Sequence, residues 1–109
     1  MKVQNKIHPD AVIVDDPFFA AYVNYLGHDV MKCAAGSSQS SWTFLVPEFD
    51  FEIMREEFES ADTSLFLKPY VEAFKRVINF QNLARQSAGE YLTSEWRDII
   101  QGRSDRRGC

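Results

Sequence analysis

Apolar side chains recur at helical spacing in three segments of the chain, and each segment predicts a helix. The first follows Asp16, which can accept hydrogen bonds from free N–H groups, and Pro17, which loses no donor at the first helical position. Gly27 offers a left-handed stop, so this helix is expected to end near Leu26. Its apolar stripe consists of Phe18, Phe19, Tyr22, Val23 and Leu26.

A second and a third helix follow in the middle of the chain. The second is short and is predicted to start at Asp50 as its cap, with Phe49 and Met54 at the two positions of a hydrophobic staple. The third is the longest, from near Pro69 to about Ala88, with Gly89 ending it. Its inward side chains are expected to be Tyr70, Val71, Phe74, Val77, Ile78 and Ala84. A fourth, short amphipathic helix is predicted over 93–100, capped by Thr93 or Ser94.

Strand-like patterns lie between the first two helices. Apolar and polar residues alternate over 28–34, and 42–46 carries aromatic and β-branched side chains that suit a pleated surface. The Ser-rich segment 35–41 between them is a turn by composition, so the pair predicts a β-hairpin. Pro47 cannot donate to a ladder, which ends the second strand near Val46 or places it at an edge. The predicted fold class is therefore α+β: helix, β-hairpin, helix, long helix and a short C-terminal helix.

A chain of 109 residues has room for one hydrophobic core. We expect an N-terminal arm over 1–13, a compact α+β domain over 14–89, and an amphipathic segment with a polar tail over 90–109. The run 11–14 is expected to be extended and to lie against the domain. A two-stranded hairpin is marginal alone, so helices must cover it, or a further strand must join it from the arm or from another copy.

Composition and charge exclude several functional classes. The 45% hydrophobic and 26% charged content is that of a folded globular protein. A net charge of −4 argues against broad attraction to phosphate backbones or anionic lipid. No apolar run approaches the roughly 20 residues that cross a bilayer. The two cysteines, Cys33 and Cys109, form no Cys-x-x-Cys pair, and we expect a reduced protein in the cytoplasm, away from membranes.

Motifs for catalysis or for cofactors are missing from the sequence. His8 and His28 lie far apart, and no glycine loop for phosphates or nucleophile elbow is present. The carboxylates of Glu52, Glu56 and their neighbours are more typical of a solvated helix face than of an acid and base pair. We therefore expect no catalytic residue, no metal and no cofactor. A small enzyme with His28 or these carboxylates in a cleft is the least favoured alternative.

The leading hypothesis is a non-catalytic protein-binding module that self-associates or serves as a small subunit or inhibitor of a larger assembly. An open hairpin edge can be extended by another strand. Tryptophan is enriched at the energetic centres of interfaces, and two tryptophans lie outside the strongest core patterns. The predicted partner-binding residues are Trp42, Trp96, Ile99 and Ile100.

The alternative is a nucleic-acid-binding accessory protein. It would use a basic face of the long helix and an arginine-rich tail against phosphates. The predicted contacts are Lys75, Arg76, Arg85, Arg103, Arg106 and Arg107. A solvated helix face and a tail without a binding role are the competing interpretations of the same charges.

The segment 14–28, Val-Asp-Asp-Pro-Phe-Phe-Ala-Ala-Tyr-Val-Asn-Tyr-Leu-Gly-His, resembles the opening of a family of small bacterial and phage proteins called domain of unknown function 5659. The likeness continues through 42–46 and 70–77 and covers about residues 14–82. It implies a helix and hairpin fold in a bacterial or phage-infected cell, or in a virion. The family has no assigned activity, so the resemblance supplies no catalytic residue. The N-terminal arm and the continuation after Gly89 depart from its pattern.

Overall fold

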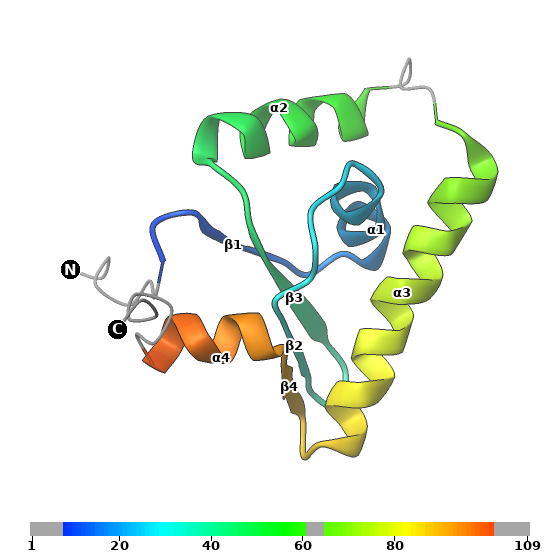
Figure 1. The fold of residues 1–109 in the computed structure, drawn as a ribbon. Coiled ribbons are helices and arrows are strands. Elements are labelled where there is room, and N and C mark those ends of the chain that lie inside the picture. Colours follow the sequence, from blue (N-terminus) through cyan, green and yellow to red (C-terminus); the bar gives the residue numbers. More distant parts are fainter. Residues whose placement is uncertain (1–7, 61–64, 102–109) are drawn as a thin grey trace.

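An antiparallel sheet of four strands, in the order β1-β3-β2-β4, organises this computed structural model, which describes residues 8–60 and 65–101 (Figure 1). The strands are β1 (Ala11–Val14), β2 (Lys32–Ala35), β3 (Ser40–Leu45) and β4 (Glu90–Leu92). The helices of the described residues are α1 (Pro17–Tyr25), α2 (Glu48–Glu59), α3 (Leu67–Gln86) and α4 (Ser94–Gln101). The predicted α+β class is confirmed.

The helices lie on both sides of the sheet. Figure 1 shows α1 and α3 on one side and α4 on the other, with α2 packed beyond α1. Inward side chains of β3, led by Trp42 and Phe44, meet Val77 of α3 and Val23 of α1 in one core. The Trp42 Nε1 donates to the Val77 carbonyl oxygen at 3.0 Å, which satisfies the polar end of a ring that is 1% exposed.

The predicted limits of the first helix agree with α1 to within one residue. The Asp16 side chain accepts a hydrogen bond from the Phe18 N–H at 3.0 Å, and Pro17 takes the first position. Gly27 has a φ of 106°, the left-handed region that favours glycine. Phe18, which we expected in the core, is 57% exposed, although its ring stacks on Phe74 at 5.4 Å between centroids.

The predicted hairpin is present, and a further strand joins it from the N-terminal arm, as one of the expected alternatives required. The additional strand after Gly89 was not predicted. Strands β1 and β4 add one neighbour on each side: Val12 lies opposite Phe44, and Cys33 lies opposite Tyr91. The expected boundary at 13–14 falls inside β1, and the segment after Gly89 belongs to the same sheet as the hairpin. The three-residue β4 carries too short an alternation to be recognised locally, and only its pairing with β2 identifies it.

The start of the second helix also differs from the prediction. Helix α2 begins at Glu48 after Pro47, and no side chain caps it. Asp50 lies in its first turn, where a carboxylate suits the positive helix end. Phe49 is 75% exposed and forms no staple. The staple prediction fails because the cap is Pro47 and not Asp50, so the helix starts three residues earlier and includes Phe49 on its outer side.

The long third helix is confirmed with a shifted start and an unusual end. It begins at Leu67, so Pro69 occupies the third position, where its missing N–H costs no helical bond. At its C-terminus the Gly89 N–H donates to the Ala84 carbonyl at 2.8 Å, and both Ala88 and Gly89 have positive φ. Val71, predicted to face inward, is 39% exposed.

The predicted short C-terminal helix is α4, and Thr93 is its cap. The Thr93 Oγ1 accepts from the Trp96 N–H at 3.2 Å and donates to the Met31 carbonyl at 3.0 Å. This hydroxyl therefore ties α4 to the sheet, and Trp96 is 4% exposed. The predicted amphipathic helix therefore packs on the sheet through Trp96, one of the predicted partner-binding residues.

Candidate functional site

The outer edge of the sheet at β1 leaves backbone groups open. The Val46 N–H donates to the Asp10 carbonyl at 2.9 Å, in register with the pairs that continue along β1 and β3. Because the bonds of an antiparallel ladder alternate, Val12 and Val14 direct their backbone groups toward β3, and Ile13 directs its own away from it. The hydrogen bonds of the turns and loops among residues 8–60 and 65–101 do not use the Ile13 N–H or carbonyl either. Ile13 is also 70% exposed.

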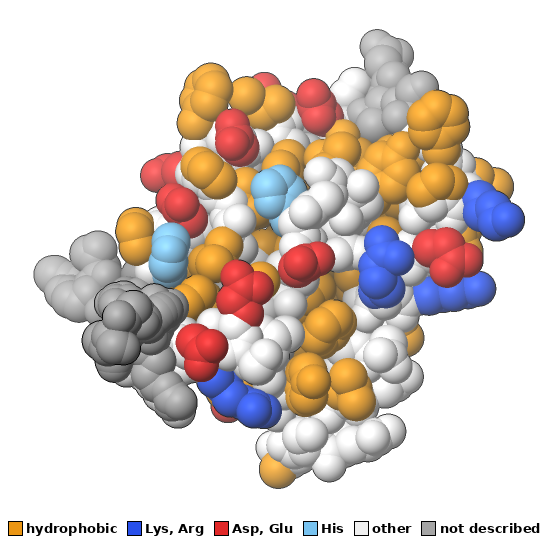
Figure 2. All heavy atoms as spheres, in the orientation of Figure 1, with side chains coloured by type: hydrophobic (Ala, Val, Ile, Leu, Met, Phe, Trp, Pro, Cys, Tyr) orange, Lys and Arg blue, Asp and Glu red, His pale blue; other side chains and the backbone are white. Residues whose placement is uncertain are grey.

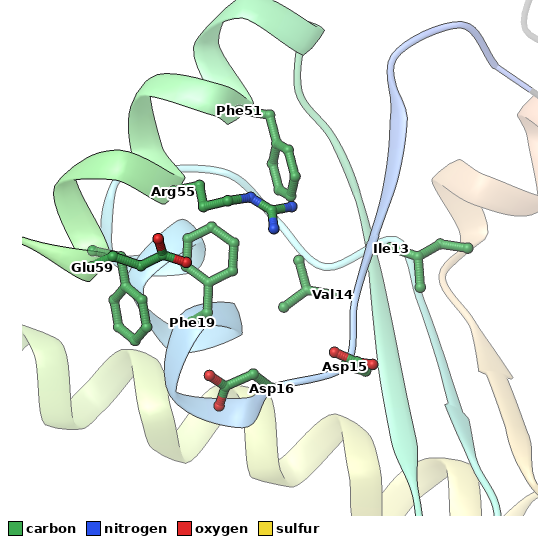
Figure 3. A pocket seen from close by; sticks show the side chains of 9 residues that line it. Ile13, Val14, Asp15, Asp16, Phe19, Phe51, Arg55 and Glu59 are labelled. Atoms are coloured by element: carbon green, nitrogen blue, oxygen red, sulfur yellow. The ribbon is translucent and has the colours of Figure 1, made fainter.

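A pocket of about 160 Å³ adjoins this edge, between β1, the start of α1 and α2 (Figure 3). Figure 3 shows Val14 pointing into the pocket and Ile13 pointing to the opposite side of the strand. The lining residues are Ile13, Val14, Asp15, Asp16, Phe19, Phe51, Arg55, Phe58 and Glu59. The pocket and the open backbone of β1 thus form one continuous surface.

Aromatic rings and one cation form the inner wall of the pocket. The Phe19 ring contacts those of Phe51 and Phe58, with centroids 5.6 and 5.0 Å apart. The Arg55 guanidinium lies 5.1 Å from the Phe51 ring centre and 6.0 Å from that of Phe19, within the range of cation–π attraction. This stacking holds the guanidinium beside the Phe51 and Phe19 rings of the pocket wall (Figure 3), and Arg55 as a whole is exposed.

Three carboxylates surround the pocket without converging. Figure 3 places Asp15 below the end of β1, Asp16 at the start of α1 and Glu59 on α2, spread around the rim. Across the described ranges no three or more His, Cys, Asp or Glu side chains gather in a way that could hold a metal ion. The rim is therefore polar, but the described residues do not present a metal centre.

A shallow hollow on the other side of β1 continues the same surface. It is lined by Ile13, Asp15, Ala34, Gly36, Gln39, Ser40 and Ser41, and its volume is about 300 Å³. Most of these side chains are small, so the surface beside the Ile13 side chain is recessed. A strand placed beside β1 would direct alternate side chains into the pocket and toward this hollow, since successive side chains of a strand point to opposite faces.

The structure does not bring the four predicted partner-binding residues together. Trp42 is 1% exposed and lies in the core between β3 and α3, and Trp96 is 4% exposed on the other side of the sheet. Both rings are buried and cannot reach a partner in this fold. Ile99 is half-buried, and Ile100 is 44% exposed on α4. Trp42 lies on β3, a central strand of the sheet, whereas the predicted two-stranded hairpin has no central strand.

The basic residues predicted for nucleic acid are also dispersed. Arg76 and Arg85 are nine residues apart, about two and a half turns, and so lie on opposite sides of α3. The Arg76 Nε donates to the Asn24 Oδ1 at 2.8 Å, whereas Lys75 is exposed. The predicted contacts Arg103, Arg106 and Arg107 lie outside the described residues.

Two buried acidic groups have strongly raised pKa values, and neither lies at the pocket surface. Burial raises the pKa of the Cys33 thiol to about 11, so the sulfur remains protonated and weakly nucleophilic at neutral pH. Burial, followed by the hydrogen bond to Glu57, raises the pKa of Tyr22 to about 12. Both perturbations come from the packed interior, and they mark structural positions.

The extended run expected over 11–14 is β1, but the sequence assigned the open edge to the hairpin and predicted neither Arg55 nor the pocket. The signal for Arg55 was present, because an arginine three residues before Phe58 and four residues after Phe51 shares a helix side with both rings. The signal for the edge was the β-rich run 11–14. Neither signal showed that β1 and α2 line the same pocket.

Among the described residues no helix combines the length and the apolar character needed to cross a membrane. Comparison of the chain with protein-family models, curated proteins and solved structures finds no match. The resemblance to domain of unknown function 5659 stays a prediction.

Proposed function

We propose that this chain is a non-catalytic protein-binding module that takes up an extended segment of a partner protein as a fifth strand beside β1. The observation that supports it is the edge position of Ile13, whose N–H and carbonyl face away from β3 next to an aromatic pocket. Strand addition uses these two properties together: main-chain hydrogen bonds provide affinity, and pockets for alternate side chains provide specificity.

The pocket favours one large apolar side chain from the added strand. A cavity of roughly 150 Å³ is enough to hold a benzene ring, and this pocket has about 160 Å³ between Val14, Phe19 and Phe51. Arg55 lies at its mouth and can donate to a carbonyl or carboxylate of the same segment. The partner segment is therefore expected to be extended, with an aromatic or long aliphatic residue facing the pocket.

Peptides selected from a randomised display library against the full chain would test this proposal. Ile13→Pro removes the outward N–H, and an edge strand tolerates proline where that N–H makes no internal bond. Ile13→Thr keeps the N–H and a β-branched side chain as the matched control. We expect Ile13→Pro to weaken binding of the selected peptides more than tenfold by calorimetry, with Ile13→Thr within about threefold of the wild type.

Protection of the Ile13 amide in hydrogen exchange on peptide binding is the second expected result, because the bond to the peptide would shield that N–H. Equal affinities of the Pro and Thr variants, or an unprotected Ile13 amide in the complex, would overturn strand addition.

The proposed setting is that of a small accessory subunit or inhibitor in the cytoplasm of a bacterial or phage-infected cell. Among the described residues no observation favours the nucleic-acid alternative, because Arg76 and Arg85 do not share a helix side.

A further inference from the structure

Charge is segregated between two neighbouring helices of this small protein. Helix α2 carries six carboxylates and one arginine, whereas α3 carries four lysines and arginines and one glutamate, Glu72. Figure 2 shows acidic side chains gathered over α2 and basic side chains over α3. Net charges of opposite sign on two exposed helices create complementary electrostatic surfaces on one molecule.

The outer side of α2 combines carboxylates with exposed apolar residues. Phe51 and Met54 face the core, so the opposite side presents residues offset by half a turn. That side carries Phe49, Glu52, Ile53 and Glu56, with Phe49 75% exposed and Ile53 39% exposed. These four residues are the acidic face.

The outer side of α3 combines lysines with exposed apolar residues. Ala73, Val77 and Ala84 face the core. The opposite side carries exposed Glu72, which lies one turn from both Lys68 and Lys75 and lowers the net charge there. The same side carries Leu67, Lys68, Val71 and Lys75, with Leu67 75% exposed and Val71 39% exposed. These four residues are the basic face. The exposed ring of Phe18 stacks on Phe74 of the same helix and extends the apolar part of this surface.

The two faces cannot meet within one molecule. Helix α1 packs against the inner sides of both helices: Phe19 contacts Phe51 of α2, and Tyr25 contacts Tyr70 of α3. Figure 1 shows α1 between α2 and α3, so the acidic and basic faces point away from it in different directions. Each face therefore remains available to a second copy.

We propose that copies of this chain associate head to tail, with the acidic face of one copy seated on the basic face of the next. This contact places Glu52 and Glu56 near Lys68 and Lys75 while the apolar residues of both faces pack together. A two-fold contact of either face with the same face of its copy would instead set lysine against lysine, or glutamate against glutamate, which like-charge repulsion disfavours. A head-to-tail contact is heterologous, so repetition produces a ring or a filament.

This inference uses surfaces other than the β1 edge and goes beyond the proposed function. Two variants block one face each with neutral, helix-forming residues: Phe49→Gln with Ile53→Gln blocks the acidic face, and Leu67→Gln with Val71→Gln blocks the basic face. The substituted positions are matched in exposure, 75% and 39% in each pair. Sedimentation equilibrium from micromolar to millimolar concentration would give the molar mass of each.

We expect the wild type to exceed twice the 12.6 kDa monomer mass with rising concentration, and to dissociate at high ionic strength. Each blocked variant alone should remain monomeric. Their equimolar mixture should form a species of two chains, because each variant retains the face that the other lacks. If a blocked variant does not fold, the charge reversals Glu52→Lys with Glu56→Lys and Lys68→Glu with Lys75→Glu replace it.

A wild type that stays monomeric throughout would overturn the inference. So would dimerisation of either blocked variant on its own, which indicates a symmetric contact. Ile13→Pro is the separating control: it should keep head-to-tail association while losing peptide binding. Loss of self-association in Ile13→Pro would place the contact at β1 and contradict the helix faces, leaving strand addition intact.

Discussion

The hydroxyl of Tyr22 connects α1 to α2 from inside the protein. It donates to the Glu57 Oε1 at 3.1 Å, and Tyr22 is 4% exposed. Burial is the main reason that its pKa rises from 10.0 to about 12, and the bond to Glu57 adds to the shift. The same group therefore holds two helices together and resists ionisation.

Stability is expected to fall at alkaline pH because of this shift. Below pH 10 the Tyr22 hydroxyl is protonated in the folded and the unfolded chain, so its contribution to stability is fully present. Above pH 10 the unfolded chain releases this proton first, and the stability falls until the pH reaches the folded pKa of about 12. At about 1.4 kcal/mol per pKa unit, the shift from 10.0 to about 12 makes the loss roughly 3 kcal/mol. Chemical denaturation of wild type and Tyr22→Phe from pH 8 to 12 measures it.

The Tyr22→Phe variant should show a shallower loss of stability, and the remaining loss should come from groups such as Cys33, whose pKa is raised to about 11. Identical pH profiles for wild type and variant would contradict the assignment to Tyr22.

At the scale of elements, the end of α3 has an alanine where a glycine would be expected. Ala88 has a φ of 62° and is followed by Gly89 with a φ of 96°, and the Gly89 N–H closes the motif on the Ala84 carbonyl. Residues other than glycine pay a steric cost in the left-handed region. The turn into β4 therefore stores a small strain at Ala88.

Ala88→Gly is expected to stabilise the protein by about 0.5–1 kcal/mol, because relief of the left-handed strain exceeds the added freedom of the unfolded chain. Gly89→Ala should destabilise it because that φ disfavours any side chain, whereas the added Cβ would make an ordinary contact, at 3.5 Å, with the Ala35 carbonyl oxygen. Urea denaturation midpoints measure both. A destabilising Ala88→Gly would show that the alanine is unstrained.

At the scale of the whole molecule, the two ends of the described chain complete the sheet. Strand β4 pairs with β2, Thr93 bonds to Met31, and Trp96 is buried on the side opposite α3. The compact domain expected over 14–89 lacks all three features. The hairpin is thus stabilised by a strand and a helix that follow it by about fifty residues in the chain.

A chain that ends at Gly89 is expected to lose cooperative unfolding, because it exposes the β2 edge and the surface that Trp96 covers. Trp96→Ala in the full chain should cost about 3 kcal/mol, and Ile100→Ala, at an exposed position, well under 1 kcal/mol. Thermal unfolding followed by circular dichroism compares the three. An unchanged transition in the shortened chain would show that β4 and α4 are dispensable.

The sequence alone predicted the helices closely and the hairpin, because helical spacing and caps such as Asp16 and Thr93 are set by residues within about four positions of one another. The sequence also shows that segment 48–59 is mainly acidic and segment 67–86 is mainly basic. The neighbours of β2 and β3, the burial of Trp42 and the open backbone of Ile13 depend on pairings between distant segments, which leave little local pattern. Only the tertiary structure decided these features, since a strand's edge position and a helix's outer face exist only relative to what packs beside them.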